Sequence, residues 1–259
     1  MVGSIKPDRG DEKCFSEECM KNNKLILLMP LRSLLFILIF VIFAAVSGKQ
    51  LADISNIWSV AASIINIVLV LALVHITKNQ GGYLKLINYE NGKTRPKHVF
   101  AMIGIILLVG MGGMLLAGFI CYGVIMPNAA TMMIAPIPAI LAMINLVVLP
   151  VSTALAEDSL YLGCGVRQFE NKYAAIIVPA FFFAIQHSFI PTLYDVRYMI
   201  YRFISFLPLT VILCIHYRKH QNPLPIMIGH AVIDMATAGQ ILATSVIPGF
   251  YDMMLSQSK

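Results

Sequence analysis

Seven long apolar runs divide this chain of 259 residues, and they constrain its fold more than any other feature. Each run is long enough for a helix to cross the hydrocarbon core of a bilayer, which takes about 20 residues. Only 12% of the residues are charged, too few to cover a soluble domain of this size. The sequence therefore predicts an all-α fold, a polytopic transmembrane bundle of about seven helices. The runs lie at 27–47, 57–77, 99–125, 133–168, 173–193, 198–217 and 224–247.

The fourth run is too long for one simple crossing and contains Pro150, a residue type that removes one backbone hydrogen bond from a helix. A break at Pro150 would change the number of helices, so the expected range is six to eight. We also expect Pro150, Gly163 and Gly165 to loosen this helix and to admit water.

The first residues form a polar tail. We predict a cytoplasmic tail at residues 1–24, followed by a single transmembrane domain at 25–259. The tail contains no cleavable signal of the usual order, because the first apolar run starts only near Leu25.

The distribution of basic residues predicts the orientation in the membrane. Lysine and arginine gather in the tail, in the segment 78–97, and after the fourth and sixth runs. The positive-inside rule then places the N-terminus in the cytoplasm and the C-terminus outside. The same pattern explains the net charge of +6 without a nucleic-acid partner. We expect an integral protein of a prokaryotic plasma membrane, with the Arg202 side chain extended toward the lipid headgroups.

Several ionisable residues interrupt the later apolar runs, where an isolated charge is costly. The candidates for a functional site are Glu157 and Asp158 in the fourth run, His187 in the fifth, and His230 and Asp234 in the seventh. Because a helix rises ~1.5 Å per residue, these groups lie at similar depths on three helices. His230 and Asp234 are four residues apart and share one helix face. We predict that four of these residues, Glu157, His187, His230 and Asp234, form one polar site inside the bundle.

Each of these groups, taken alone, also fits a structural role. A single buried histidine commonly donates to a carbonyl group, and adjacent acids can form a solvated helix end. His230 and Asp234 could stabilise only their own helix. Their coincidence at matching depth favours a shared functional site.

The order of these residues resembles the motifs of the CPBP family, the CAAX proteases and bacteriocin-processing enzymes also called the Abi family. The family motifs EExxxR, FxxxH and HxxxN or HxxxD lie on separate transmembrane helices. Here they read EDSLYL from Glu157, FAIQH from Phe183 to His187, and HAVID from His230 to Asp234. The resemblance covers about residues 140–245, which we predict to be the catalytic core. It implies an intramembrane protease with a catalytic glutamate and no cofactor.

The resemblance also implies a role for each residue. Glu157 would be the general base, and His187 would orient the attacking water. His230 and Asp234 would bind the scissile carbonyl and its oxyanion. An Asp234 carboxylate accepts hydrogen bonds but cannot donate them, so it is also expected to orient His230 or to accept from the substrate.

Two positions in the first motif differ from the family pattern. Asp158 replaces the second glutamate, and Leu162 replaces the arginine that places a cation near the acids. On an α-helix, residue 162 would face Asp158 one turn away. We therefore expect Asp158 to be protonated or paired with Arg167, and both Asp158→Asn and Leu162→Arg to be tolerated. Asp158 and Phe183 are predicted to support the site.

Four functions are compatible with this pattern. The first is a metal-independent intramembrane endopeptidase that acts on a membrane-associated peptide or a prenylated protein. The second, favoured by Leu162, is a non-catalytic protein on the same scaffold, active in bacteriocin self-immunity or as partner of another membrane protein. A zinc hydrolase with His187, His230 and a carboxylate as ligands is the third, although the chain has no HExxH motif. A proton-coupled transporter is the fourth, although no inverted repeat is evident.

Overall fold

The computed structural model describes residues 23–258, and every regular element in this part of the chain is a helix. The predicted tail at 1–24 lies almost entirely outside the described residues. The long helices are α3 (Leu28–Ser47), α4 (Trp58–Thr77), α6 (Pro96–Tyr122), α8 (Ala139–Thr153) with its continuation η3 (Ala154–Val166), α9 (Ala174–Gln186) with its continuation η4 (His187–Phe189), α10 (Val196–His220) and α11 (Leu224–Val246). The short elements are α2 (Asn23–Ile26), η1 (Ala52–Ile57), α5 (Gly82–Leu86), α7 (Asn128–Thr131), η2 (Met132–Ile134) and α12 (Phe250–Gln257).

Six of the described helices are long and apolar enough to cross a membrane. They coincide with six of the predicted runs. The fifth run forms a shorter apolar helix, Ala174–Phe189, which is below the length of a full perpendicular crossing. The prediction of an all-α polytopic bundle with six to eight membrane helices is confirmed.

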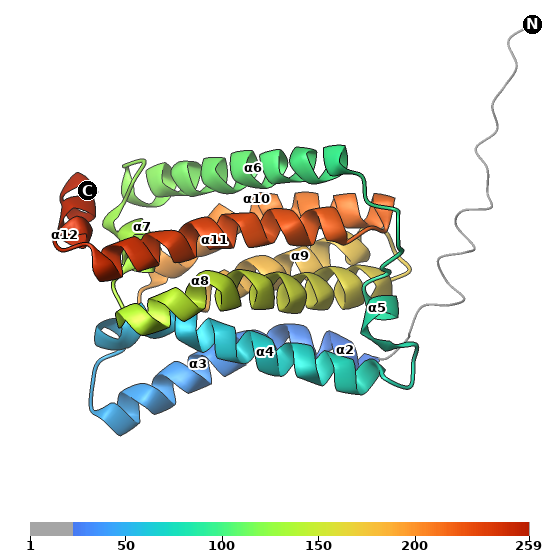
Figure 1. Cartoon of the computed structure of the whole chain (residues 1–259), viewed down its shortest axis with the longest axis horizontal. Helices are drawn as coiled ribbons and strands as arrows, with labels where there is room; N and C mark the ends of the chain where they lie inside the picture. Colours follow the sequence, from blue (N-terminus) through green and yellow to red (C-terminus); the bar gives the residue numbers. More distant parts are fainter. Residues whose placement is uncertain (1–22, 259) are drawn as a thin grey trace, which may run out of the picture.

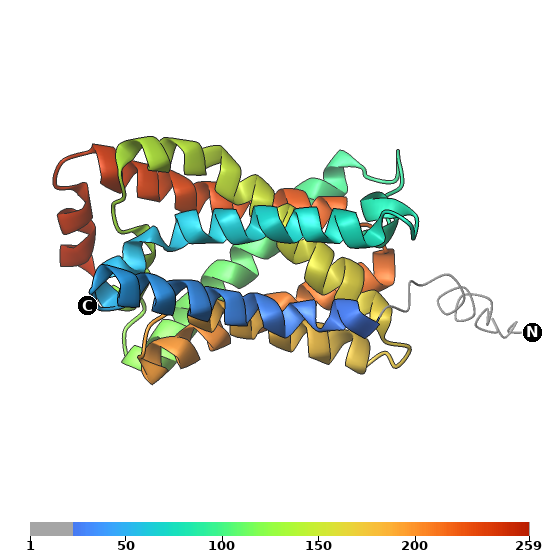
Figure 2. The same ribbon diagram turned by 90° about the horizontal axis from the view of Figure 1, so that it is seen from below.

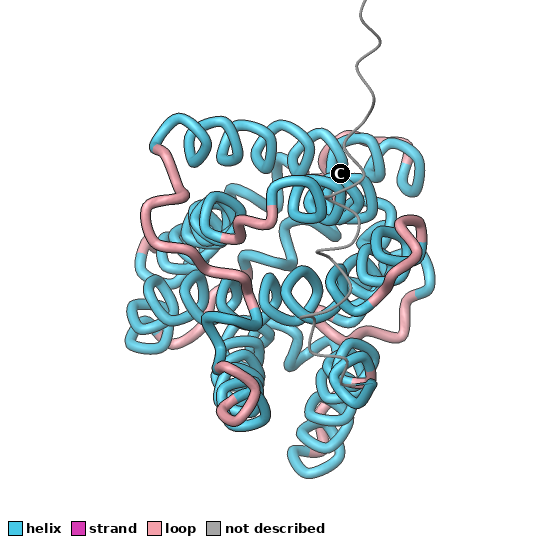
Figure 3. The backbone as a smooth tube through the Cα atoms, turned by 90° about the vertical axis from the view of Figure 1, so that its right-hand side faces the viewer, coloured by secondary structure: helices cyan, strands magenta, loops and turns pink. Residues whose placement is uncertain are grey.

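The helices pack in layers. Figure 1 shows α6 along the top of the bundle, α10 and α11 beneath it, then α8 and α9, with α3 and α4 at the bottom. Figure 2, seen from below, shows α3 and α4 in front of the other helices. Figure 3, viewed along the bundle, shows most helices end-on, whereas α6 crosses the top obliquely. The middle layers are therefore covered by protein on both sides.

Successive apolar helices run in opposite directions, so their connections alternate between the two ends of the bundle. The connections 78–95, 167–173 and 221–223 lie at the end that also holds α2 and α5, and α12 lies at the other end (Figure 1). The basic residues of these connections consequently share one end of the molecule. Its assignment to the cytoplasmic side stays a prediction.

The element η3 is the centre of the bundle. It continues α8 directly after Thr153, so the fourth run makes a single crossing and does not break at Pro150. It is a π-helix, a wider helix with hydrogen bonds from residue i to i+5 that is often found at functional sites. Every residue of η3 except Leu155 is buried, since α3, α4, α5, α9, α10 and α11 all pack against it.

The glycines of η3 allow other helices to approach closely. A Cβ atom on Gly165 would lie 2.7 Å from the Cβ of Pro179 in α9. A Cβ atom on Gly163 would lie 3.1 Å from the carbonyl oxygen of Leu86 in α5. Because protein interiors are close-packed, only glycine fits these two contacts without a shift of the neighbouring backbone.

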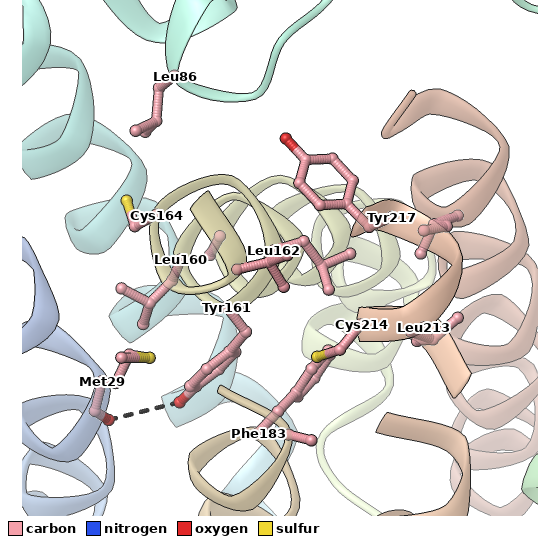
Figure 4. Close-up of a cluster of buried hydrophobic side chains, with 14 of the residues drawn as sticks. Met29, Leu86, Leu160, Tyr161, Leu162, Cys164, Phe183, Leu213, Cys214 and Tyr217 are labelled. Atoms are coloured by element: carbon pink, nitrogen blue, oxygen red, sulfur yellow. Dashed lines mark hydrogen bonds between the residues drawn. The ribbon is translucent and has the colours of Figure 1, made fainter. Parts of the chain in front are cut away.

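Leu162 lies in the largest apolar cluster of the bundle. It is completely buried and packs with Leu213, Cys214 and Tyr217 of α10 (Figure 4). An arginine here would place a charge among apolar side chains. The sequence-based expectation that Leu162→Arg is tolerated therefore has no support in the packing.

Candidate active site

One cavity is lined by all four ionisable residues that were predicted to form a site. Glu157 from η3, His187 from η4, and His230 and Asp234 from α11 all line it, together with Phe183. Its volume of about 140 Å³ is roughly ten times the space that one water molecule needs. Asp158 lies behind this surface and reaches the site through His230. The structure therefore brings the residues of the three motifs together.

Glu157 is held by an arginine from the first membrane helix. Arg32 Nη2 in α3 lies 2.6 Å from Glu157 Oε1, and both side chains are almost fully buried. Gln186 Nε2 donates to the other oxygen, Glu157 Oε2, at 2.9 Å. This ion pair compensates the charge of the carboxylate inside the bundle.

The same arginine organises a wider polar network. Arg32 also donates to Asn66 Oδ1 at 2.7 Å and to Gln186 Oε1. Tyr161 donates its hydroxyl proton to Gln186 Oε1 at 2.8 Å, and Asn66 donates to Thr153 Oγ1 at 3.0 Å. Four helices thereby orient one carboxylate.

Sequence reasoning missed Arg32, Gln186 and Asn66. Arg32 lies within the first apolar run, so the rule that intramembrane charges mark functional sites should have found it. Gln186 directly precedes His187, and Asn66 is a polar residue inside the second run. No sequence spacing connects these positions with Glu157, because they lie on other helices.

Asp158 pairs with a histidine and not with an arginine. Its Oδ1 atom lies 3.2 Å from His230 Nδ1. Arg167, the cation expected to pair with Asp158, donates instead to the carbonyl oxygens of Lys85 at 2.8 Å and Leu86 at 2.9 Å. The expected pair with Arg167 does not form, because Arg167 follows the last residue of η3 and its guanidinium reaches the backbone of α5.

His230 is surrounded by three carboxylates. Asp158 holds its Nδ1 atom, while its Nε2 atom lies 3.9 Å from Glu157 Oε2 and 3.8 Å from Asp234 Oδ2. The residue expected to orient His230 was Asp234, one turn away, but Asp158 makes the closer contact. Asp234 Oδ2 has no hydrogen-bond partner among the described residues and borders the cavity.

His187 is fixed in orientation by its own helix and by α10. Its Nδ1 atom lies 2.8 Å from the carbonyl oxygen of Phe183, and its ring stacks on Phe206 with centroids 3.7 Å apart. A carbonyl oxygen can only accept, so Nδ1 carries the proton and the Nε2 lone pair is free. This Nε2 atom is able to accept a proton from water.

Arg202 does not reach the lipid headgroups as predicted. It is only 3% exposed and lines the cavity. Its Nε atom donates to the carbonyl oxygen of His187 at 3.4 Å, and its guanidinium lies over the Phe206 ring at 4.8 Å.

Residues 23–258 contain no group of three His, Cys, Asp or Glu side chains placed to hold a metal ion. His187 and His230 do not form such a group with any carboxylate. The proposed zinc ligands His187 and His230 therefore lack the geometry of a metal centre.

This geometry changes the expectation for Asp158. We expect Asp158→Asn to lower the rate of any reaction at this site by about 10–100-fold, because partners that orient a functional histidine typically contribute this much. The rate should be measured across a pH series beside Asp252→Asn, which alters an exposed acid of α12. Equal rates and equal pH profiles for Asp158→Asn and the wild type would show that Asp158 does not orient His230.

Fold and site together define a polytopic α-helical membrane protein with an acid–imidazole site buried in its bundle. Residues 139–236 match the family model described as type II CAAX prenyl endopeptidase Rce1-like. The match confirms the resemblance to the CPBP family over this segment, which contains all three motifs. No curated protein and no solved structure matches the chain.

Proposed function

We propose that the protein is an intramembrane endopeptidase that cleaves membrane-associated or prenylated peptides with a water molecule activated by Glu157. The observation that carries this proposal is the cavity in which Glu157, His187 and His230 meet, with Glu157 oriented by Arg32. A membrane-embedded hydrolase must bring water and a base to a peptide bond, and this cavity offers both space and a carboxylate.

In the proposed reaction, Glu157 takes a proton from water while the water oxygen attacks the carbonyl carbon. His187 accepts a hydrogen bond from the same water through Nε2. His230, held by Asp158 through Nδ1, donates from Nε2 to the oxyanion of the tetrahedral intermediate. One such donor typically contributes about 3 kcal/mol. Glu157 then passes its proton to the leaving nitrogen as the carbon–nitrogen bond breaks, which leaves a carboxylic acid and an amine.

The alternative is a non-catalytic protein on the same scaffold, acting in bacteriocin self-immunity or as a partner of another membrane protein. The sequence favoured this alternative because Leu162 stands at the position of the motif arginine. Arg32 supplies a buried cation to Glu157 from another helix, so this substitution does not leave the acids without a counter-charge.

Three further features belong to the proposal. The chain consists of a cytoplasmic tail at 1–24 and one transmembrane domain at 25–259, with the catalytic core at about 140–245. The basic end of the bundle faces the cytoplasm, which suits the positive-inside rule. The host membrane is a prokaryotic plasma membrane.

The test is hydrolysis in water enriched in ¹⁸O. Full-length protein in lipid vesicles is incubated with prenylated peptides and with a native membrane-protein extract, and products are analysed by mass spectrometry. We expect new C-terminal carboxylates that carry one ¹⁸O atom, also after exhaustive chelation. The control contains heat-denatured protein. Absence of labelled products would support the scaffold function, and activity that is lost on chelation and restored by zinc would support a metal hydrolase.

A further inference from the structure

A second cavity lies at the end of the bundle opposite the basic connections, beside α7 (Figure 1). It is an open groove of about 820 Å³ and shares no lining residue with the cavity of Glu157. Two helices that are long enough to cross a membrane, α3 and α6, end at this groove, and a third, α10, begins there. The groove therefore lies at the level where these spans are expected to leave the hydrocarbon core and to meet the lipid headgroups.

The uncharged side chains of this groove suit a lipid. Tyr122, Tyr194 and Tyr198 line it, and tyrosine is enriched at membrane interfaces because its ring is apolar and its hydroxyl is polar. The volume falls within the range of about 300–1,000 Å³ that is typical of ligand sites. A groove with polar and apolar parts fits a molecule that has one polar and one apolar end. The apolar part of the lining includes Val41, Ala44, Met132 and Leu193.

The groove also contains one cation and one acid. Lys49 comes just after α3, and Asp195 is the N-cap of α10. They form no ion pair with each other, and the Lys49 side chain has no hydrogen-bond or ion-pair partner among the described residues. A lining with two separate, opposite charges is complementary to a zwitterion, because a ligand with a single charge would leave one of them without a partner.

Asp195 keeps one carboxylate oxygen available. Its Oδ1 atom accepts from the backbone nitrogens of Arg197 at 2.9 Å and Tyr198 at 3.2 Å, whereas Oδ2 accepts from no described residue. The guanidinium of Arg197 does not pair with this acid. Its Nε atom donates to the carbonyl oxygen of Cys121 at 2.7 Å, and its plane lies over the Tyr122 ring at 4.8 Å. A cation from outside the described residues is therefore the partner that Oδ2 lacks.

We propose that this groove binds one molecule of phosphatidylethanolamine, a phospholipid whose headgroup carries a phosphate and a primary ammonium. Lys49 pairs with the phosphate, Asp195 accepts hydrogen bonds from the ammonium, and an acyl chain lies against the apolar part of the lining. The quaternary ammonium of phosphatidylcholine has no N–H group to donate, and phosphatidylglycerol offers no cation to Asp195. This lipid site is separate from the proposed reaction and does not depend on it.

The test is native mass spectrometry of the full-length protein in detergent. The protein is titrated with phosphatidylethanolamine, phosphatidylcholine or phosphatidylglycerol, all with the same acyl chains, and the bound fraction gives an apparent Kd. A fourth titration uses glycerophosphoethanolamine, which has the same headgroup without acyl chains. This titration distinguishes a lipid site from a site for a free, soluble headgroup.

We expect the wild type to bind phosphatidylethanolamine at least about tenfold more tightly than the other two lipids, since a hydrogen bond to a charged group contributes about 1.5–3 kcal/mol. Lys49→Gln should weaken phosphatidylethanolamine binding about tenfold. Asp195→Asn should remove the preference over phosphatidylglycerol, while asparagine still caps α10. The matched controls Lys78→Gln and Asp252→Asn alter an exposed cation and an exposed acid elsewhere, so they should keep the wild-type preference.

Equal affinity of the wild type for the three lipids would overturn the proposal. So would a preference for phosphatidylethanolamine that persists in Asp195→Asn, or an affinity that Lys49→Gln leaves unchanged. Soluble glycerophosphoethanolamine bound as tightly as the lipid would assign the groove to a free headgroup instead. Because no peptide is present, this result is independent of the ¹⁸O experiment, and failure of either experiment leaves the other readable.

Discussion

Replacing Arg32 by leucine is expected to destabilise the folded protein by about 3–5 kcal/mol, the usual cost of breaking a buried ion pair from one side. The substitution leaves the Glu157 carboxylate buried without its cation and removes the donor to Asn66 and Gln186. It should also lower any Glu157-dependent activity by more than about 100-fold, because the carboxylate loses its orientation. Denaturant unfolding in detergent measures the first effect, and peptide release per folded molecule measures the second.

Three further variants distinguish loss of the ion pair from general destabilisation. Lys49→Leu removes an exposed cation that follows the same helix, and it should leave stability within about 0.5 kcal/mol. The double variant Arg32→Leu with Glu157→Gln removes both charges, so it should be more stable than Arg32→Leu alone. Leu162→Arg added to Arg32→Leu should not restore stability, because residue 162 packs against α10. An Arg32→Leu protein as stable as the wild type would refute the importance of this pair.

Glu157→Gln is expected to reduce peptide hydrolysis by about 10²–10⁴-fold, the range that a positioned general base contributes. Glutamine keeps the shape of the side chain and can still accept from Arg32, but it cannot take a proton from water. The measurement is the rate of ¹⁸O-labelled product formation, normalised to the folded fraction, since the substitution also leaves Arg32 without its counter-ion.

The matched control is Glu90→Gln, which alters an exposed glutamate paired with Lys93 at 3.0 Å. It should leave the rate unchanged, because exposed ion pairs contribute little. If Glu157→Gln forms product at the rate of Glu90→Gln, Glu157 is not the base. In that case the non-catalytic scaffold becomes the better account of the molecule.

The sequence by itself determined the class of fold and the main residues of the cavity. A bilayer offers no partner for backbone polar groups, so runs of about 20 apolar residues must form helices, and hydropathy alone locates them. The predicted runs accordingly match the observed helices. Glu157, His187, His230 and Asp234 could be selected because ionisable residues inside apolar runs are costly and therefore gather.

Only the tertiary structure decided which groups meet. Arg32 and Glu157 are 125 positions apart, and only the packing of α3 against η3 brings them within 2.6 Å. Leu162 lies in an apolar cluster and Asp158 pairs with His230 of α11, and spacing along a single helix predicted neither contact. The burial of Arg202 likewise depends on how neighbouring helices pack. Hydropathy and spacing describe one helix at a time, whereas the partner of each charge depends on how neighbouring helices pack.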